Sequence, residues 1–154
     1  MFLKSLKIEN DTGVIRQIDF RKGLNLIVDN TPFRDEKTGN NVGKTTVLRL
    51  IDYCLGGSAK DIYTDKENKN INEEVKKFLE STRVVVSLTC VTKLDGDSKD
   101  VIVRRNFLSR KNLICQIDGT NVPNNDFEHV LGQKLFGKIS QSPLLDKSYR
   151  TTSV

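Results

Sequence analysis

The segment Gly39–Thr46 reads GNNVGKTT and separates two regions with different hydrophobic patterns. Before it, the short apolar run Leu24–Val28 (LNLIV) favours a buried strand, and the polar stretch Asn30–Val42 favours a loop. After Gly43, apolar residues recur with helical spacing until the pair Gly56-Gly57. A loop between a strand and a helix that ends in Gly-Lys-Thr is typical of a phosphate-binding loop.

The end of this loop carries the groups that a nucleoside triphosphate and its metal ion need. Gly43 keeps side-chain atoms away from the phosphates, and the N–H groups after it lie at the positive end of the predicted helix. Lys44 can reach the β- and γ-phosphates, and the Thr45 hydroxyl is a hard oxygen ligand suited to Mg²⁺. The residues expected to bind the nucleotide are Thr38, Gly39, Asn40, Asn41, Val42, Gly43, Lys44, Thr45 and Thr46.

The loop departs from the strict phosphate-loop pattern at one position. Thr38 stands where the pattern has glycine, and the glycine follows one residue later, at Gly39. Because Thr38 carries a Cβ, we expect some loss of affinity if that position needs a positive φ. The competing interpretation is a glycine loop with an incidental Lys-Thr pair, which the flanking strand and helix patterns disfavour.

Alternating polar and apolar residues predict a β-meander around this loop, and two more segments have helical spacing. Strands are expected at Phe2–Asn10, Val14–Phe20, Arg83–Lys93, Asp100–Leu108 and Lys111–Ile117, with turns at Asp11–Gly13 and Asp95–Asp97. Helices are expected at Ile71–Glu80, capped by Asn72, and at Pro123–Phe136, capped near Asn124 or Asn125. Their apolar faces comprise Ile71, Val75, Phe78 and Leu79 in the first and Phe127, Val130, Leu131 and Leu135 in the second. The polar stretch Ser58–Asn70 is expected to be irregular.

Three stretches resemble the N-terminal half of an SMC/RecF-type ATPase head, within the ABC-ATPase class. They are SLKIEN (residues 5–10), FRKGLNLIVDN (residues 20–30) and RLIDYCLGG (residues 49–57). The loop is similar to the Gly-x-Asn-Gly-x-Gly-Lys-Ser/Thr of these heads, with Asn41 in place of a glycine and the insertion Thr31–Lys37 before it. The resemblance is closest over residues 2–57 and looser over residues 82–150.

The resemblance implies an α/β P-loop NTPase fold. Residues 1–154 would form the N-terminal lobe of an ABC/SMC-type head, with an antiparallel β-meander and a phosphate-loop helix, but without the C-terminal lobe and coiled coil. It implies ATP and Mg²⁺ as cofactors, and a head–head dimer or a partner subunit that completes the site. The helix end resembles bacterial SMC-like proteins of largely unassigned function, several of which serve genome maintenance or phage defence. We therefore expect such a role for the complete protein.

The resemblance also gives candidate roles to residues outside the loop. Gln141 is the candidate for a glutamine that senses Mg²⁺, and is otherwise a plain loop residue. Lys7 and Arg16 are candidates for adenine contacts, or else solvated strand charges. Heads of this class bind DNA through basic surfaces, which here would otherwise form a solvated face of mixed charge. The basic pairs are Lys76-Lys77, Arg104-Arg105 and Arg110-Lys111.

The sequence does not identify the acidic residues that activate water in ABC-type hydrolysis. Asp118 follows an interrupted apolar run and precedes Gly119, which predicts a hairpin turn, and Cys54–Ser58 (CLGGS) predicts a helix C-cap rather than a signature motif. No catalytic residue is assigned, and we expect the chain alone to bind ATP and hydrolyse little or none. Two other functions stay open: an ATP-regulated protein-interaction subunit, and a stand-alone P-loop kinase or GTPase.

The composition excludes several other classes of protein. With 154 residues, a net charge of +5 and 29% charged residues, the chain fits one domain or a piece of one, and not a collagen, a pure coiled coil or a disulfide scaffold. No apolar run approaches the ~20 residues of a transmembrane helix, and the first residues lack a signal peptide's apolar core. We expect a cytoplasmic protein without membrane contact, in which Cys54, Cys90 and Cys115 are buried free thiols and His129 is a solvated helix residue.

Overall fold

A computed structural model describes residues 1–28, 43–65, 68–93 and 98–137, and its centre is an antiparallel sheet of six strands in the order β2-β1-β3-β4-β5-β6. The strands are β1 (Phe2–Asn10), β2 (Gly13–Asp19), β3 (Val85–Val91), β4 (Asp100–Asn106), β5 (Cys115–Ile117) and β6 (Thr120–Asn121). The helices are α1 (Lys44–Cys54), α2 (Lys60–Tyr63), α3 (Glu73–Ser81) and α4 (Asn124–Phe136), and a 3-10 turn spans Arg110–Asn112. The predicted α/β class and antiparallel meander are confirmed for this part of the chain.

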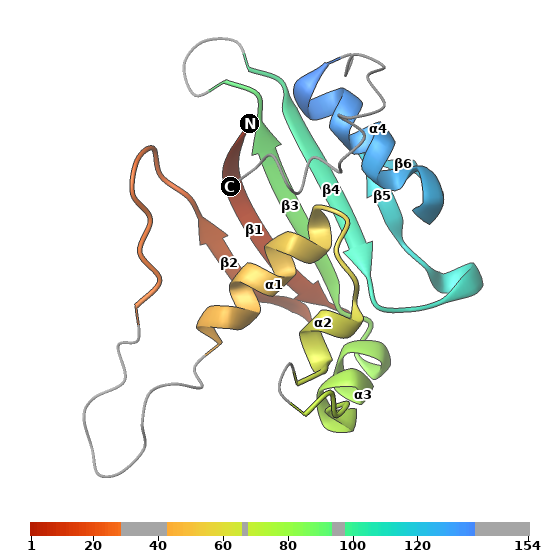
Figure 1. The fold of residues 1–154 in the computed structure, drawn as a ribbon. Coiled ribbons are helices and arrows are strands. Elements are labelled where there is room, and N and C mark those ends of the chain that lie inside the picture. Colours follow the sequence, from red (N-terminus) through yellow and green to blue (C-terminus); the bar gives the residue numbers. More distant parts are fainter. Residues whose placement is uncertain (29–42, 66–67, 94–97, 138–154) are drawn as a thin grey trace.

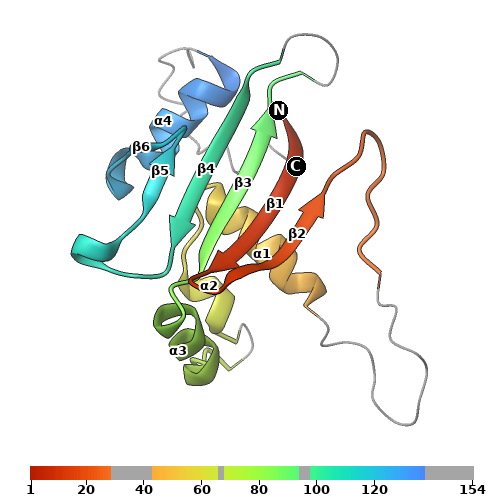
Figure 2. The same ribbon diagram turned by 180° about the vertical axis from the view of Figure 1, so that it is seen from behind.

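The helices gather on one side of the sheet. Figure 1 shows α1 lying across the sheet, with α4 beside β5, and in the reverse view of Figure 2 the strands lie in front of α1. Residues of α1, α4 and the strands belong to one continuous hydrophobic core. The described elements therefore form two layers, a sheet and a set of helices, with α1 at the centre of the helical layer.

A row of apolar side chains across the sheet forms the middle of this core. Leu6 pairs with Leu88, Leu88 with Val103, and Val103 with Ile117 on successive strands, and none of the four exposes any surface. Directly paired residues of antiparallel strands point to the same face, so this row faces the helices. The predicted alternation of the strands is confirmed by this register.

The next row across the same sheet is entirely polar and faces the other way. It runs through all six strands as Gln17, Lys7, Ser87, Arg104, Gln116 and Asn121, in the order in which they pair. Because successive side chains of a strand point to opposite faces, this row lies on the side away from α1. The sheet thus has one apolar face and one hydrated face.

The predicted strand Leu24–Val28 is wrong. These residues form no strand in the structure, and Leu24 and Leu26 are 83% and 72% exposed. An apolar run becomes a buried strand only when neighbouring strands satisfy its backbone groups, and within the described residues β2 pairs with β1 alone. The predicted turn Asp95–Asp97 and the whole of the predicted loop Asn30–Val42 lie outside the described residues.

The helix predictions hold with three corrections. The Asn72 side chain caps α3 as predicted, accepting a hydrogen bond from the N–H of Val75 at 3.1 Å, but only Leu79 of its apolar face is buried. Ser58–Asn70 is not wholly irregular, because it contains α2, whose Ile62 is buried in the core.

Helix α4 is capped by Pro123, since Asn124 is already its first residue. Of its four predicted core residues, Phe127, Leu131 and Leu135 are buried and Val130 is partly buried.

Candidate functional site

The N-terminus of α1 begins at a residue with an unusual backbone conformation. Gly43 is the N-cap, with φ 71° and ψ 4°, and its carbonyl oxygen accepts the first helical hydrogen bond, from Val47 at 3.0 Å. A Cβ at Gly43 would meet no atom within 4 Å, so the left-handed backbone, and not lack of space, is what favours glycine here. The sequence analysis expected glycine here for close approach to phosphate, and the structure adds a conformational reason for it.

The first turn of α1 is open to an anion. The N–H groups of Lys44, Thr45 and Thr46 precede the first helical bond and so have no acceptor within the helix. The turn contains no acidic residue and no side chain caps it. The helix dipole adds positive potential at the same point. The first turn of α1 therefore has the donors and the field that phosphate oxygens require.

The side chains of this turn supply the remaining groups. Lys44 is half-buried, and Thr45 and Thr46 are exposed at the surface. None of the ion pairs among the described residues includes Lys44. The turn thus combines a cation, two hydroxyl groups and N–H groups that have no acceptor within the helix, a set that fits a polyphosphate.

Other members of the predicted site cannot be placed. Thr38, Gly39, Asn40, Asn41 and Val42 lie outside the described residues, and so does Gln141. Their assignment to nucleotide and Mg²⁺ stays a prediction.

The described residues bring together no cluster of three or more histidine, cysteine or carboxylate side chains that could hold a metal ion. A Mg²⁺ ion that binds with a nucleotide keeps several waters and takes few protein ligands beside the phosphates. The exposed hydroxyl of Thr45 suits one such ligand.

Asp118 lies in a hairpin turn, as predicted, and not at the end of a buried strand. It occupies the β5–β6 connection with φ 52° and accepts hydrogen bonds from the N–H of Ile102 at 2.8 Å and from the Nζ of Lys134 at 2.5 Å. Partial burial acts to raise the pKa of Asp118, but these two bonds and the charge of Lys134 together lower it below its usual value. The carboxylate is therefore engaged in holding α4 to the hairpin.

The C-terminus of α1 is the helix cap predicted from CLGGS. The N–H of Gly56 donates to the carbonyl oxygen of Tyr53 at 3.2 Å, and that of Gly57 to Asp52 at 2.8 Å. Gly56 has φ 110°, a conformation that residues with a Cβ rarely adopt. Two carbonyls at this end, of Tyr53 and Gly57, also accept hydrogen bonds from the side chain of Arg105.

Arg105 was missed as a structural residue, because the sequence analysis grouped it with Arg104 as a surface basic pair. Its side chain lies inside, at 8% exposure, whereas Arg104 lies on the opposite face and pairs with Glu9 at 3.3 Å. The alternation of Val101, Val103 and Arg105 on one strand was the signal that could have identified it. The pair therefore does not present two exposed cations to DNA.

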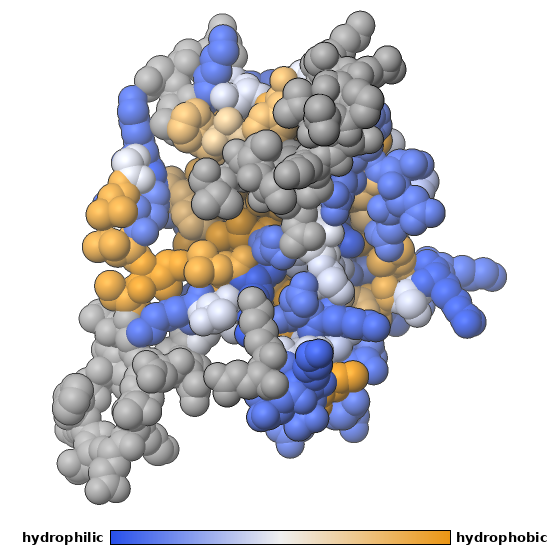
Figure 3. All heavy atoms as spheres, in the orientation of Figure 1, coloured by the Kyte–Doolittle hydropathy of each residue, from blue (hydrophilic) through white to orange (hydrophobic). Residues whose placement is uncertain are grey.

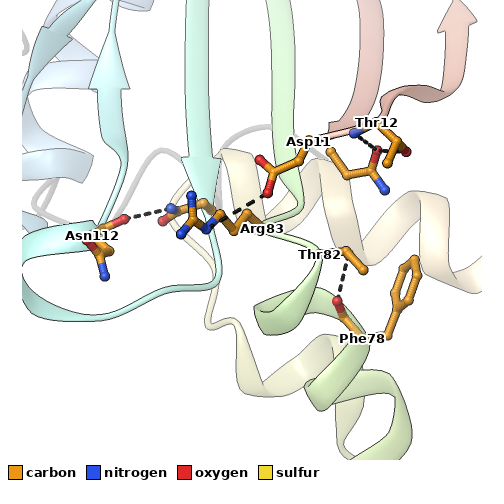
Figure 4. A network of polar contacts seen from close by, with 8 residues as sticks. Asp11, Thr12, Phe78, Thr82, Arg83 and Asn112 are labelled. Carbon is orange, nitrogen blue, oxygen red and sulfur yellow. Dashed lines mark hydrogen bonds and ion pairs between the residues drawn. The ribbon is translucent and has the colours of Figure 1, made fainter.

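The adjacent Asn106 links β4 to the loop that follows. Its side chain donates to the carbonyl oxygen of Asn112 at 2.8 Å and accepts from the N–H of Ile114 at 2.8 Å. Figure 4 shows Asn112 and the dashed line that ends at its carbonyl oxygen. Figure 4 also shows Arg83 facing Asp11, in an ion pair of 3.9 Å between two exposed side chains. Both polar atoms of the buried amide have a backbone partner, so Asn106 is a fixed support for this loop.

Most of the charges near the hydrated face of the sheet neutralise one another. Lys7 and Arg104 both pair with Glu9, and Lys4 pairs with Asp100 at 2.7 Å. The hydrogen bond from Lys7 is the main cause that lowers the pKa of Glu9 below its usual value. Lys7 is thus engaged with a neighbouring carboxylate, whereas Arg16 is exposed on the edge strand β2.

The cysteines are buried and free, as predicted. Burial raises the pKa of Cys90 to about 12 and raises the pKa values of Cys54 and Cys115 as well. These thiols are protonated at neutral pH and are poor nucleophiles. His129 is exposed on α4, where its ring contacts the side-chain amide of Gln133 at 2.9 Å, which confirms its predicted solvated position.

A groove of about 640 Å³ lies between α1, the start of β1 and residues 20–27. Its apolar walls include Phe20, Ile27, Leu48 and Ile51. Figure 3 shows hydrophobic side chains gathered around this hollow. Sequence analysis missed it, because it arises from the exposure of the run predicted as a strand.

Within the described ranges, no helix has the length and apolar character that crossing a membrane requires.

A family model described as an AAA domain matches residues 5–142, which include the candidate site and all strands beyond the first part of β1. None of the curated proteins matches the sequence. AAA ATPase domains generally use ATP and Mg²⁺, in agreement with the donors at the start of α1. The chain therefore belongs to the AAA domain family and has a nucleotide-binding, ATPase-type fold.

Proposed function

We propose that this chain binds Mg·ATP as the N-terminal lobe of an SMC/RecF-like ATPase head. The observation that carries the proposal is the first turn of α1, where the left-handed Gly43 is followed by N–H groups without an acceptor in the helix, by Lys44 and by Thr45, and where no residue is acidic. Lys44 would neutralise phosphate charge, and the Thr45 hydroxyl would serve as one ligand of Mg²⁺. The loop before Gly43 would surround the phosphates with further N–H groups.

Additional polypeptide would complete the site. Residues 24–28 expose apolar side chains beside the groove that borders α1, and such a surface favours burial against another segment. A C-terminal lobe, a second head or a partner subunit would provide it, together with the acid that activates water. We therefore expect binding without significant hydrolysis by residues 1–154 alone.

Isothermal titration calorimetry with ATP and with GTP, each with Mg²⁺, tests this function. Lys44→Ala is expected to weaken binding of ATP at least about tenfold, since a charge-assisted contact to phosphate is lost. Lys60→Ala, at the exposed start of α2, is the matched control and should bind like the wild type. Absence of heat with both nucleotides would contradict the proposal, and a preference for GTP would favour a GTPase.

A second candidate is an ATP-regulated protein-interaction subunit, and the apolar groove beside α1 favours it. In this case the chain would capture a partner without hydrolysing ATP. Size-exclusion chromatography coupled to light scattering, with and without ATP, separates a nucleotide-dependent dimer of heads from a monomer that awaits a different partner.

For the complete protein, the resemblance to SMC-like proteins supports DNA maintenance or phage defence in the cytoplasm. Exposed basic residues such as Lys77 and Lys111 would then contact DNA phosphates without reading sequence. A gel-shift titration with and without ATP tests this role, and binding that is insensitive to both ATP and salt would contradict it.

A further inference from the structure

Arg105 is the one charged residue in the interior of the described part of the chain, where Asn106 is its only polar companion. It comes from β4, in the middle of the sheet, and points toward the helical layer. None of the ion pairs among the described residues includes it. A buried guanidinium without a carboxylate must obtain compensation from other groups.

Most of the compensating groups belong to the C-terminal end of α1, and Phe127 of α4 and Cys115 of β5 provide the others. The Nη1 of Arg105 donates to the carbonyl oxygens of Tyr53 at 2.5 Å and of Gly57 at 3.2 Å. Its guanidinium carbon also lies 4.2 Å from the centre of the Tyr53 ring and 4.9 Å from that of Phe127. The negative end of the helix dipole and two aromatic faces thus stabilise the cation.

This arrangement constrains α1 along its axis. If the helix slid or rotated, the guanidinium of Arg105 would lose its contacts with both carbonyl oxygens and with the Tyr53 ring at the same time. A cation at the surface could replace such contacts with water, but a cation in the interior cannot. The Tyr53 hydroxyl adds a second tie to β4, through the carbonyl oxygen of Asn106. The C-terminus of α1 is therefore fixed to the sheet by two groups from adjacent residues.

The helix connects this anchor to the candidate phosphate site. Tyr53 comes nine residues after Lys44 in α1, so Lys44 lies about 14 Å from the anchor at ~1.5 Å per residue. A short helix moves as a rigid rod, so a shift at its C-terminus displaces the N–H groups of its first turn by a similar amount. Hydrogen bonds to phosphate tolerate only a few tenths of an ångström before they weaken.

We infer that Arg105 is a positioning residue for the phosphate site, because it sets the axial position of α1 from the end opposite to the ligand. The effect of Arg105 on nucleotide affinity rests on the proposed function, whereas its effect on the position of α1 does not. Arg105 itself does not touch the nucleotide.

The test compares Arg105→Met with Arg104→Met, which removes the neighbouring, exposed cation of the same strand. Circular dichroism first fixes a temperature at which all variants are folded. Calorimetry with Mg·ATP should then give an affinity at least fivefold weaker for R105M and within twofold of wild type for R104M. R105K, which keeps a buried donor for the carbonyls, should recover part of the loss.

Hydrogen exchange measured by NMR without nucleotide provides the second readout. The N–H of Val47, which closes the first turn of α1, should exchange at least fivefold faster in R105M than in R104M, relative to the amides of β3 that report global unfolding. A merely local packing role would change exchange only around residues 53–57 and 127. If R105M does not fold, R105Q, which keeps one amide donor, replaces it with the same expectations.

The outcomes separate the two proposals. If the wild type binds no ATP, the proposed function fails, and Val47 exchange alone decides the role of Arg105. Unchanged Val47 exchange in R105M would overturn the inference. In a wild type that binds, unchanged affinity in R105M would also overturn it.

Discussion

The hydroxyl of Tyr53, on α1, donates a hydrogen bond to the backbone carbonyl oxygen of Asn106, on β4, and both residues are buried. Tyr53→Phe keeps the aromatic ring, whose centroid lies 5.0 Å from that of the stacked Phe107 ring, but it removes the hydroxyl that donates to this carbonyl oxygen. We expect the free energy of unfolding to fall by about 1–3 kcal/mol. Urea denaturation measures it, with Tyr63→Phe as a half-buried control expected within ~0.5 kcal/mol of wild type.

Stability should decline in alkaline solution because of buried acidic groups. Burial raises the pKa of Cys90 from 9.0 to about 12 and that of Tyr53 from 10.0 to about 12. At a pH below their ordinary pKa values, Cys90 and Tyr53 are protonated in both the folded and the unfolded chain. Above them the unfolded chain loses protons that the folded chain keeps, so stability falls by about 1.4 kcal/mol per pH unit for each group that titrates fully.

Urea denaturation at pH 8, 10 and 11 measures this decline. Cys90→Ala removes one of the groups and should make the decline between pH 9 and 11 shallower, whatever its effect at pH 8. An identical slope in this variant would show that Cys90 does not ionise more readily on unfolding.

The central row of the sheet should be the most sensitive part of the core. Leu88 has no exposed surface and pairs with Leu6 and Val103, so Leu88→Ala should cost about 2–5 kcal/mol through lost burial and a residual cavity. Ile102, on β4 and 42% exposed, provides the matched position, and Ile102→Ala should cost about 1 kcal/mol or less. Thermal denaturation of both variants gives the comparison, and equal losses would contradict the assigned faces.

Gly43 should resist substitution for a conformational reason. Gly43→Ala places a Cβ at φ 71°, which costs about 1–2 kcal/mol of strain although no atom obstructs it. Gly43→Asn should cost less, because asparagine adopts this conformation more readily. Chemical denaturation ranks the two, and a stability of Gly43→Ala equal to that of the wild type would show that the backbone at residue 43 relaxes freely.

Local rules in the sequence anticipated most of the described fold. The alternation in β1, β3 and β4 determines which side chains face the helices, and the Asn72 cap and the Gly56 helix end follow from side-chain and backbone chemistry within a few residues. Each of these depends on neighbours in the chain, so a pattern is sufficient to predict it.

The errors involve groups whose environment comes from distant parts of the chain. Leu24–Val28 has the composition of a strand, but no described strand pairs with it. Helix α2 forms in a polar stretch because Ile62 reaches the core. The sequence gives Arg105 the pattern of an exposed basic pair with Arg104, and only the packing of α1 against β4 shows that its side chain is buried. For the candidate site, the sequence predicted a glycine before the helix and the donors of its first turn, but neither the left-handed backbone of Gly43 nor the anchor at the other end of the helix.

The exposed segment 24–28 also bears on how the protein behaves in concentrated solution. Together with the outer edge of β2, which pairs with no further strand among the described residues, it presents aliphatic surface of the kind that seeds aggregation. The cations Arg16, Arg21 and Lys22 flank this region, and like charges on approaching molecules oppose their contact. Colloidal stability should therefore decrease as added salt screens these charges.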